Sequence, residues 1–333
     1  MIRAGAGATM RAVVVSRPGG PEVLEFHDDW PRPVPAEGRV LIRVMAFGLN
    51  RGELYTRLGH SPAVAFPRVL GIECAGIVEA APGTSFEPGQ TVVATTGGMG
   101  RAYDGSYAEF VSVPAGNVHA VETTLRWTDL AAVPELFHTA WGALELGLGL
   151  KAGQALLIRG GSSAVGLVAA DYAKRLGATV LSTTRDPAKD GRLRSFGADH
   201  VVRETGAIAP DVRTIVPDGV DAMFDLVGTK VLTDSFACIR TGGILCMAGL
   251  LGGEWTIPGF TPGAAIPSTT KFTYFSSSAT PMRTEALRAY LRGLECGEYR
   301  MPLERVFPFD RIREAHSLME SDTAAGKIVI AVR

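Results

Sequence analysis

The chain has 333 residues, with 33 Lys and Arg against 34 Asp and Glu, a formal net charge of −1 and 46% hydrophobic residues. This length is enough for two domains with full cores, and the interspersed charges provide no basic face for nucleic acid or an anionic membrane. The four cysteines stand far apart without a C-x-x-C pair, which favours reduced, mostly buried thiols in a cytoplasmic protein and argues against a metal framework.

The beginning of the chain contains no targeting signal that we recognise. It lacks the apolar core of a signal peptide, and no apolar run in the sequence reaches the length of a membrane span. Residues 1–9 are mostly small, whereas Met10-Arg-Ala-Val is typical of the start of a strand. We therefore expect residues 1–9 to be a disordered extension or the product of an upstream start codon.

The first segment, up to about residue 134, is rich in short β runs separated by glycine and proline. Apolar and polar residues alternate in Val40–Ala46, and Pro88-Gly-Gln is a typical turn. These features predict a small, largely antiparallel barrel, whose strands we expect at 12–15, 23–26, 39–47, 73–80, 91–95 and 106–113.

The stretch 154–181 predicts a strand, a tight turn and a helix. Ala155–Ile158 has the length of a strand, and apolar residues with helical spacing begin at Val165. Against the pattern G-x-G-x-x-G the turn reads Gly161, Ser163, Gly166, so the middle glycine is replaced. Because a second strand follows at the spacing of a βαβ unit, we interpret the turn as a site for a dinucleotide pyrophosphate; the alternative is an ordinary βα turn of small residues.

The rest of the second segment alternates between strands and helices, which predicts a doubly wound parallel sheet and hence an α/β fold class for the chain. The further strands are expected at 179–184, 199–202, 221–226, 243–248 and 272–277, and the helices at 186–196, 229–239 and 284–296. The tail ends in a strand that begins at Lys327 and most simply returns to the first domain.

The end of the second strand of the parallel sheet is where the cofactor ribose is discriminated. An acidic residue there binds a 2′-hydroxyl, whereas an arginine accommodates a 2′-phosphate. Thr184 is followed by Arg185, whose planar fork suits a phosphate, and Lys189 adds a further positive charge. This pattern favours NADPH. Asp186 could reverse the preference, unless it serves as a helix cap.

Several motifs together resemble the zinc-independent, zeta-crystallin-like quinone oxidoreductase branch of the medium-chain dehydrogenase/reductase family. The motifs that carry the likeness are Met10-Arg-Ala-Val, Gly19–Leu24, Gly48–Gly59, Pro67–Gly76, Gly105–Glu109, the nucleotide turn, Gly197-Ala-Asp, Asp225–Gly228 and Gly326–Val329. The resemblance implies a GroES-like catalytic domain (1–134 and 285–333), a Rossmann domain (135–284) and NADPH as the hydride donor. It also implies a homodimer, formed through the edge strand Phe272–Ser277.

The resemblance further implies that no metal is bound. Zinc-dependent relatives carry a cysteine at the position of Asn50 and a Gly-His-Glu motif where this chain has Gly71-Ile72-Glu73. The four-cysteine structural lobe is also absent, and 97–104 stands in its place. We expect Glu73 and Cys74 to be packing or orienting residues. Without a Lewis acid, conjugated acceptors are easier to reduce than alcohols are to oxidise, because the charge delocalises into an enolate or hydroquinone.

The site residues are carried over from the family by position. Asn50 and Tyr55 are the candidate catalytic residues, with Tyr55 as proton donor or as a ring that packs on the barrel edge; Arg57 and His138 are weaker candidates, Arg57 being more simply a surface residue. Loops that could wall the pocket contain His60, Met99, Tyr103 and Phe260. The cofactor is expected to contact Asn50, Thr139, Gly161, Ser163, Ala164, Val165, Gly166, Thr184, Arg185, Lys189, Val227, Gly228, Ala248, Gly249, Leu250, Phe275, Ser276, Ser277 and Lys327. Ser163 is expected to offer its N–H and hydroxyl to the phosphates.

The leading prediction is an NADPH-dependent, metal-free reductase of quinones or enones. One alternative is an enoyl-thioester reductase of a biosynthetic pathway, for which Arg101, Arg283 and Arg300 could form a basic entrance. An alternative of another class is a non-catalytic NADPH-binding sensor or scaffold.

Overall fold

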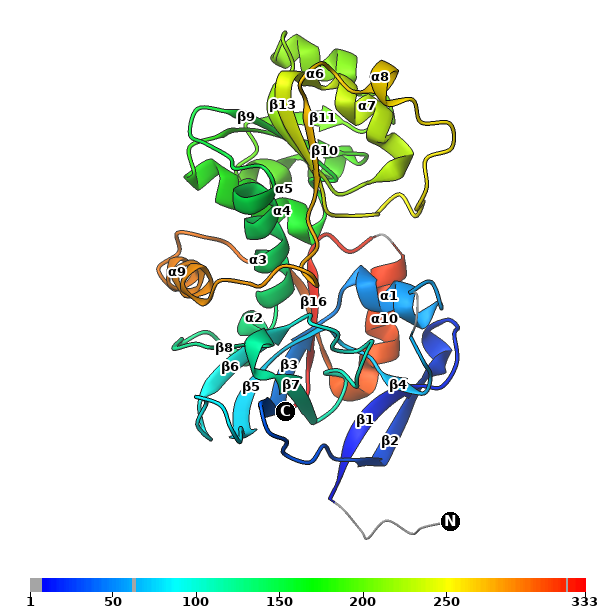
Figure 1. The fold of residues 1–333 in the computed structure, drawn as a ribbon, viewed down its shortest axis with the longest axis vertical. Helices are drawn as coiled ribbons and strands as arrows, with labels where there is room; N and C mark the ends of the chain where they lie inside the picture. Colours follow the sequence, from blue (N-terminus) through cyan, green and yellow to red (C-terminus); the bar gives the residue numbers. More distant parts are fainter. Residues whose placement is uncertain (1–7, 62–63, 322) are drawn as a thin grey trace. The chain divides into compact units, whose positions relative to one another are not determined.

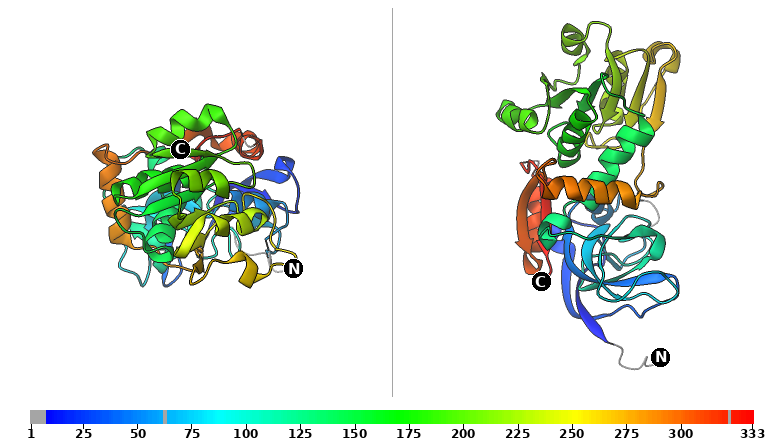
Figure 2. Two further views of the ribbon diagram at one scale, coloured as in Figure 1. Left: turned by 90° about the horizontal axis from the view of Figure 1, so that it is seen from above. Right: turned by 90° about the vertical axis from the view of Figure 1, so that its left-hand side faces the viewer.

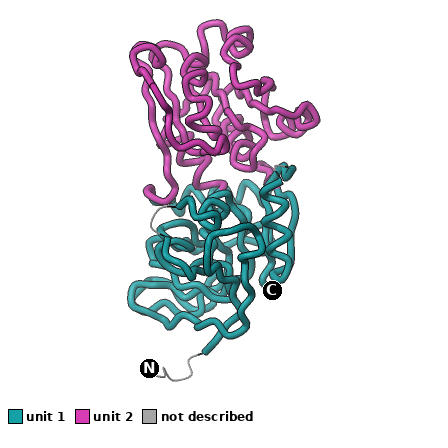
Figure 3. The backbone as a smooth tube through the Cα atoms, turned by 90° about the vertical axis from the view of Figure 1, so that its right-hand side faces the viewer, with its two compact units in different colours: residues 1–135, 281–296, 303–333 teal, residues 136–280, 297–302 magenta. Residues whose placement is uncertain are grey.

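The protein was analysed as a computed structural model that describes residues 8–61, 64–321 and 323–333. The chain divides into two compact units (Figure 3), one of residues 1–135, 281–296 and 303–333 and the other of residues 136–280 and 297–302. The first boundary lies one residue beyond the predicted one. Residues 281–284 group with the first unit and 297–302 with the second, opposite to the predicted division.

The first unit, called the barrel unit below, is built from mostly antiparallel strands (Figure 1). A small sheet has the order β2-β1-β4, and a larger one has the order β15-β16-β3-β5-β6-β8, with β7 pairing to β3; β15 and β16 run parallel. The strands are β1 (Thr9–Val15), β2 (Leu24–Pro31), β3 (Arg39–Gly48), β4 (Arg68–Val69), β5 (Glu73–Ala80), β6 (Thr91–Thr95), β7 (Phe110–Pro114), β8 (Val118–Ala120), β15 (Leu303–Pro308) and β16 (Lys327–Ala331).

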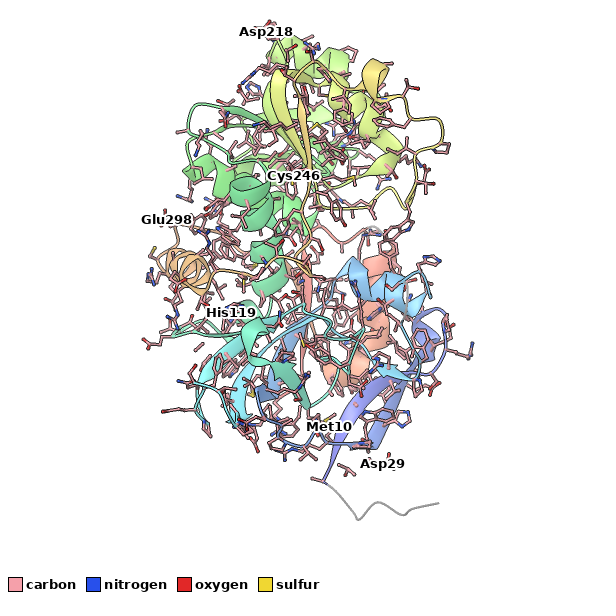
Figure 4. The ribbon with its side chains drawn as sticks, viewed as in Figure 1. Met10, Asp29, His119, Asp218, Cys246 and Glu298 are labelled. Atoms are coloured by element: carbon pink, nitrogen blue, oxygen red, sulfur yellow. The ribbon has the colours of Figure 1, made fainter. Side chains whose placement is uncertain are left out.

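Strands β1 and β2 form a hairpin, and the described chain begins at the open end of this hairpin (Figure 2). Met10 and Asp29 lie at the same open end (Figure 4). Thr9 is part of β1, so the predicted extension is too long at this residue; residues 1–7 lie outside the described part. The predicted strand at 106–113 begins only at Phe110, because Ser106 and Tyr107 bond instead to the backbone of Gly71 and Leu70.

Helices close the barrel unit on several sides. They are α1 (Arg51–Arg57), α2 (Trp127–Leu130), α9 (Thr284–Glu295) and α10 (Ile312–Glu320), with short 3₁₀ turns η1 (Pro21–Val23), η2 (Ala115–Asn117) and η6 (Phe309–Arg311). Helix α9 is tied to β8 by a 2.8 Å hydrogen bond between the His119 Nδ1 and the Thr284 hydroxyl, and His119 is labelled in Figure 4.

The tail strand β16 pairs antiparallel with β3, with Val329 opposite Gly48 and Ala331 opposite Ala46. Ile328, Val329 and Ile330 are buried. This arrangement confirms the predicted return of the tail to the first segment.

Arg57 is not the surface residue that the sequence suggested, because its side chain is fully buried. Its guanidinium bonds to the Gly19 carbonyl (3.1 Å), to the Glu320 carboxylate and to the His316 Nδ1 (3.1 Å). Since a guanidinium has no acceptor, Nδ1 must be unprotonated and the His316 Nε2–H donates to the Tyr107 hydroxyl at 3.0 Å. Burial and Arg57 lower the pKa of His316 to about 3. Arg57 therefore joins α1 to α10 as a structural cation.

The second unit, called the sheet unit below, contains a six-stranded sheet with the order β11-β10-β9-β12-β13-β14, and each pair is parallel. This confirms the predicted doubly wound sheet. The strands are β9 (Ala155–Arg159), β10 (Thr179–Thr184), β11 (His200–Arg203), β12 (Val220–Asp225), β13 (Ile239–Met247) and β14 (Lys271–Tyr274). Their apolar side chains, such as Leu157 and Met223, are fully buried.

The helices of the sheet unit are mostly short. They are α3 (Pro134–Trp141, whose first two residues belong to the barrel unit), α4 (Ala164–Arg175), α5 (Asp190–Ser195), α6 (Ala209–Ile215), α7 (Leu232–Ala237) and α8 (Pro262–Ala265), with the π-helical segment η3 (Gly142–Gly147) and 3₁₀ turns η4 (Pro187–Lys189) and η5 (Thr229–Val231). Helices α1, α2, α3, α6, α8 and α10 were not predicted from the sequence.

No helix in the described ranges is long and apolar enough to cross a membrane. The four cysteines are free thiols; Cys74, Cys238 and Cys246 are buried and Cys296 is exposed, as expected from their spacing.

Candidate functional site

The glycine-rich turn after β9 leads into α4 through Ser163, which is the N-cap of that helix. The Ser163 hydroxyl accepts from the Gly166 N–H at 3.1 Å and lies 2.8 Å from the Gly160 carbonyl, to which it donates. The Ser163 N–H bonds to the same carbonyl at 3.1 Å. Both donors that we expected to face a phosphate are therefore used inside the turn, which corrects the proposed role of Ser163.

The N–H groups of Ala164 and Val165 are the donors of this turn that suit an anion, because the first turn of a helix has no intrahelical acceptors for them. Gly166 is required for the close packing behind them: a Cβ there would lie 2.6 Å from the Gly160 carbonyl oxygen and 2.7 Å from the Gly161 Cα. The turn thus fits a pyrophosphate through backbone donors, although the second glycine of the usual pattern is missing.

The other predicted cofactor contacts of the sheet unit follow the carboxyl ends of its strands. Asp218, which precedes β12, lies at the amino end of that strand, opposite the carboxyl end (Figure 4). The turns after β12 and β13 touch, since the Leu251 N–H donates to the Leu226 carbonyl at 3.0 Å and the Ala248 N–H to the Asp225 carbonyl at 3.1 Å. The structure therefore brings together the turns that contain Val227, Gly228, Ala248, Gly249 and Leu250.

The Asp225 carboxylate organises the turn after β12. It accepts from the Val227 and Gly228 N–H groups at 2.8 Å each and from the Ser235 hydroxyl at 2.7 Å. Those two N–H groups are consequently occupied, so this turn has carbonyls and side chains to offer a cofactor.

Phe275 follows β14 and packs on α3 and η3 of the same unit. Its ring lies 5.8 Å from the His138 ring in an edge-on arrangement, and a Cβ at Gly142 would collide with it. Thr139, the next residue of α3, is buried. The His138 ring thus has an aromatic packing role beside the predicted cofactor residues Thr139 and Phe275.

The end of β10 presents a basic group to solvent. Arg185 is exposed, and Asp186 caps the η4 turn by accepting from the Ala188 N–H at 2.9 Å. Arg203 on β11 adds a cation that the sequence analysis missed; it donates to the Thr184 carbonyl at 3.3 Å and pairs with Asp190. Asp186 therefore has the capping role that was its alternative interpretation.

In the barrel unit, Asn50 begins α1 with a capping box. The Asn50 N–H donates to the Glu53 carboxylate at 3.0 Å, and the Ile72 N–H donates to the same carboxylate at 3.1 Å. This closed arrangement explains why Glu53 is only 1% exposed. The sequence contains the pattern of a capping box, an Asn followed three residues later by Glu, but this helix start was not predicted.

The Asn50 amide also belongs to a buried ion network with Glu73 on β5 and Lys327 on β16. The Lys327 ammonium contacts a Glu73 oxygen and the Asn50 Oδ1 (2.5 Å), while the Asn50 Nδ2 donates to that Glu73 oxygen at 2.9 Å. The other Glu73 oxygen accepts from the Glu135 N–H at 2.8 Å. A Cβ at Gly48 would lie 2.4 Å from both Glu73 and Lys327, so only glycine leaves room for this pair.

Burial raises the pKa of Glu53 to about 7, although Lys327 and the Ile72 N–H act in the opposite direction. The nearby Glu73 carboxylate adds to the rise in pKa, but less than burial does. The network is electrically balanced when Glu53 carries a proton.

Tyr55 lies on α1 and is partly buried, with its ring stacked on His60 at 6.4 Å between centroids. The other loop candidates have packing partners of their own. Met99 is fully buried in the barrel core, Arg39 lies over the Tyr103 ring, and Phe260 packs with Phe236 in the sheet unit. Of the three basic entrance candidates, Arg300 belongs to the sheet unit and donates to the Ser195 carbonyl.

Comparisons with known proteins agree with this architecture. Residues 36–123 match the family model of the alcohol dehydrogenase GroES-like domain, and residues 196–330 match a model described as zinc-binding dehydrogenase. A quinone oxidoreductase of Lama guanicoe is 29% identical over 97% of this chain and 98% of its own length, and one of Pseudomonas aeruginosa is 30% identical over 94% and 96%.

The chain belongs to the quinone oxidoreductase branch of the medium-chain dehydrogenase/reductase family. Among solved structures, an NAD-dependent alcohol dehydrogenase is 28% identical with a TM-score of 0.86, over 97% of this chain and all of that one. A mycobacterial protein complexed with NADPH is 28% identical with a TM-score of 0.85 and the same coverage. The fold expected from the resemblance, a GroES-like domain with a Rossmann sheet, is thus confirmed.

The residues of this chain do not fit the zinc ion that one family description mentions. Asn50 and Ile72 occupy two of the positions where zinc-dependent relatives have ligands, and isoleucine has no ligand atom. Burial raises the pKa of the Cys74 thiol to about 12, which opposes ligation. Within the described ranges, no group of three or more His, Cys, Asp and Glu could hold a metal.

Replacing Glu53 with Gln is expected to change the pH dependence of stability in this oxidoreductase. The folded state holds the Glu53 proton up to about pH 7, whereas an ordinary glutamate in the unfolded chain releases it near pH 4.5. The stabilisation is therefore complete below pH 4.5 and is lost as the pH rises to about 7, at a cost of about 3 kcal/mol in the free energy of unfolding.

Urea unfolding across this pH range measures the effect. The loss should be present in the wild type and in Glu87→Gln, which alters an exposed carboxylate, and absent in Glu53→Gln. Parallel pH curves for all three proteins would contradict the prediction.

Proposed function

We propose that this chain reduces quinones or activated C=C bonds of enones, with NADPH as hydride donor and without a metal. The observation that carries the proposal is the buried Asn50–Glu73–Lys327 network. Asn50, at a position where zinc-dependent relatives carry a cysteine, is bonded here to the Lys327 ammonium, which also neutralises Glu73. A lysine paired in this way supplies no open coordination site for polarising an alkoxide.

A bound reduced nicotinamide supplies the hydride, and the chain's task is to bind, orient and protonate. The N–H groups of Ala164 and Val165 suit the pyrophosphate. Hydride addition to a conjugated carbonyl places negative charge on the carbonyl oxygen, which hydrogen-bond donors stabilise. Tyr55, on the partly buried face of α1, is the proposed donor of the following proton.

Asn50 has a different proposed role from the one assigned on the sequence. Its amide already bonds to Glu73 and Lys327, so a substrate could use the Nδ2–H only by displacing a carboxylate. We propose that Asn50 is a positioning residue, which fixes the start of α1 and thereby the direction of Tyr55.

The function is tested with purified protein, NADPH and a panel of quinones and enones. We expect NADPH oxidation at a rate that dialysis against a chelator leaves unchanged. Tyr55→Phe should lower kcat by about 100-fold, because general acid catalysis is lost, with NADPH affinity unchanged. The outcome that overturns the proposal is no turnover with any acceptor; NADPH binding without turnover would favour the non-catalytic sensor or scaffold.

The preference for NADPH rests on Arg185, with Lys189 and Arg203 nearby. Arg185→Ala should raise the KM for NADPH about tenfold, the value of one lost charged hydrogen bond, and leave the KM for NADH nearly unchanged. Lys151→Ala is the matched control, because Lys151 is exposed and precedes β9 at the other edge of the sheet. An equal effect of Arg185→Ala on both cofactors would refute this preference.

Two of the three arginines assigned to the entrance of the enoyl-thioester alternative lie in different units. Arg283 is exposed at the start of α9, and Arg300 is bonded within the sheet unit. Activity that depends on an acyl thioester in the acceptor panel would nevertheless select this alternative.

A homodimer is the proposed assembly. Strand β14 is the edge of the parallel sheet, with Phe272 44% and Tyr274 60% exposed, and such an edge can pair with a second copy. Light scattering should give twice the chain mass of 35.2 kDa and the single mass for Tyr274→Lys. Val34→Lys, on an exposed loop of the barrel unit, should remain dimeric; a wild type of single mass contradicts the proposal.

A further inference from the structure

Backbone hydrogen bonds hold the segment between β6 and β7 against the rest of the barrel unit. The Thr96 N–H donates to the Ile72 carbonyl at 2.7 Å, and the Gly105 N–H donates to the Val69 carbonyl at 2.8 Å. Inside the segment, the Ala102 N–H donates to the Gly98 carbonyl at 2.8 Å, and the Met99 side chain is fully buried. The segment therefore holds Arg101 in a defined place.

The Arg101 guanidinium lies on the first turn of α1. A Cβ built on Gly52 would be 2.8 Å from its Nη2 and 3.6 Å from the Ile72 Cδ1. Gly52 and Tyr55 are three residues apart and so share one face of the helix. Arg101 consequently lies beside the face of α1 that carries the proposed proton donor.

Arg101 is a cation without a counterion in the described part of the chain. Its Nε is buried and has no hydrogen-bond partner there, and its guanidinium forms no ion pair with those residues. Arg43 and Arg68 also have a buried, unpartnered Nε, yet they pair with Glu79 (3.8 Å) and Asp104 (2.9 Å). A partly buried charge that is left unpaired is costly, and a bound anion removes that cost.

Two other buried cations of the barrel unit have counterions within the described chain. Lys327 is neutralised by Glu73, and Arg57 by Glu320. Arg101 thus differs from both in having its donors available to a ligand, and its planar fork matches the two oxygens of a carboxylate.

We propose that Arg101 binds a carboxylate of the acceptor, so that the preferred substrates are activated alkenes that carry an acid group. This inference rests on the proposed reductase function and names the substrate class of that site. The phosphates of the dinucleotide are the other source of an oxyanion. They have proposed donors of their own in the sheet unit, at Ala164, Val165 and Arg185, whereas Arg101 lies beside the face of α1 that contains Gly52 and Tyr55.

The test compares two acceptors that differ in one charge, trans-3-benzoylacrylate and its methyl ester. The variants are Arg101→Met, which removes the charge, Arg101→Lys, which retains it without the fork, and Arg305→Met, an exposed arginine on β15 as the control. Rates are followed by the loss of NADPH absorbance, and urea midpoints verify that each variant is folded.

The wild type should prefer the acid to the ester. Arg101→Met should lower kcat/KM for the acid by about 10- to 100-fold, mostly through KM, as expected for a lost charged hydrogen bond. The ester should change by less than about twofold, Arg101→Lys should be intermediate, and Arg305→Met should match the wild type. Equal losses for acid and ester overturn the proposal, and so does a weakened affinity for NADPH with unchanged discrimination.

A binding experiment separates this inference from the proposed function. Calorimetric titration of the NADP⁺-saturated protein with benzoylacrylate needs no turnover, and Arg101→Met should lose the binding that the wild type shows. If no acceptor is reduced but this difference persists, the proposed function fails and the carboxylate site stands. If reduction occurs but both proteins bind the acid equally, the site fails and the function stands.

Discussion

The contact between the Lys327 ammonium and the Glu73 carboxylate is the interaction on which the barrel unit depends. Both groups are removed from water, so each would be costly without the other. Their pairing ties β16 to β5, leaves room only for glycine at position 48 and fixes the Asn50 amide at the start of α1. The buried pair thus anchors the first residue before α1, the helix that carries Tyr55.

The network also shows how a barrel of this kind manages an excess of buried acid. Burial raises the pKa of Glu53, and Glu73 adds to this rise, so that a protonated Glu53 leaves one carboxylate, Glu73, opposite the Lys327 ammonium. The proposed metal-free chemistry agrees with this charge balance, because the Lys327 ammonium already neutralises Glu73.

In both units, some hydrogen-bond donors bind acceptors within the fold, and others remain for a ligand. Ser163 spends its N–H and hydroxyl on Gly160, and the N–H groups of Val227 and Gly228 are occupied by Asp225. The first-turn N–H groups of α4, the exposed Arg185 and the Arg101 guanidinium remain available. These remaining donors are positively polarised, which suits a ligand that carries several anionic groups.

Local patterns in the sequence were enough to predict the two kinds of sheet, the return of the tail strand and the glycine-rich turn between β9 and α4. These features follow from local patterns, such as alternation in β3 and the change from strand to helical spacing around Ser163. Only the tertiary structure decided which polar groups are used up. Arg57 was predicted to be a surface residue, but in the folded chain it bonds to His316 and Glu320. Lys327 and Glu73 form a buried ion pair although they are 254 residues apart in the sequence. Spacing along a chain carries no information on such partners, because the energy of an ion pair depends on the distance in space and on burial.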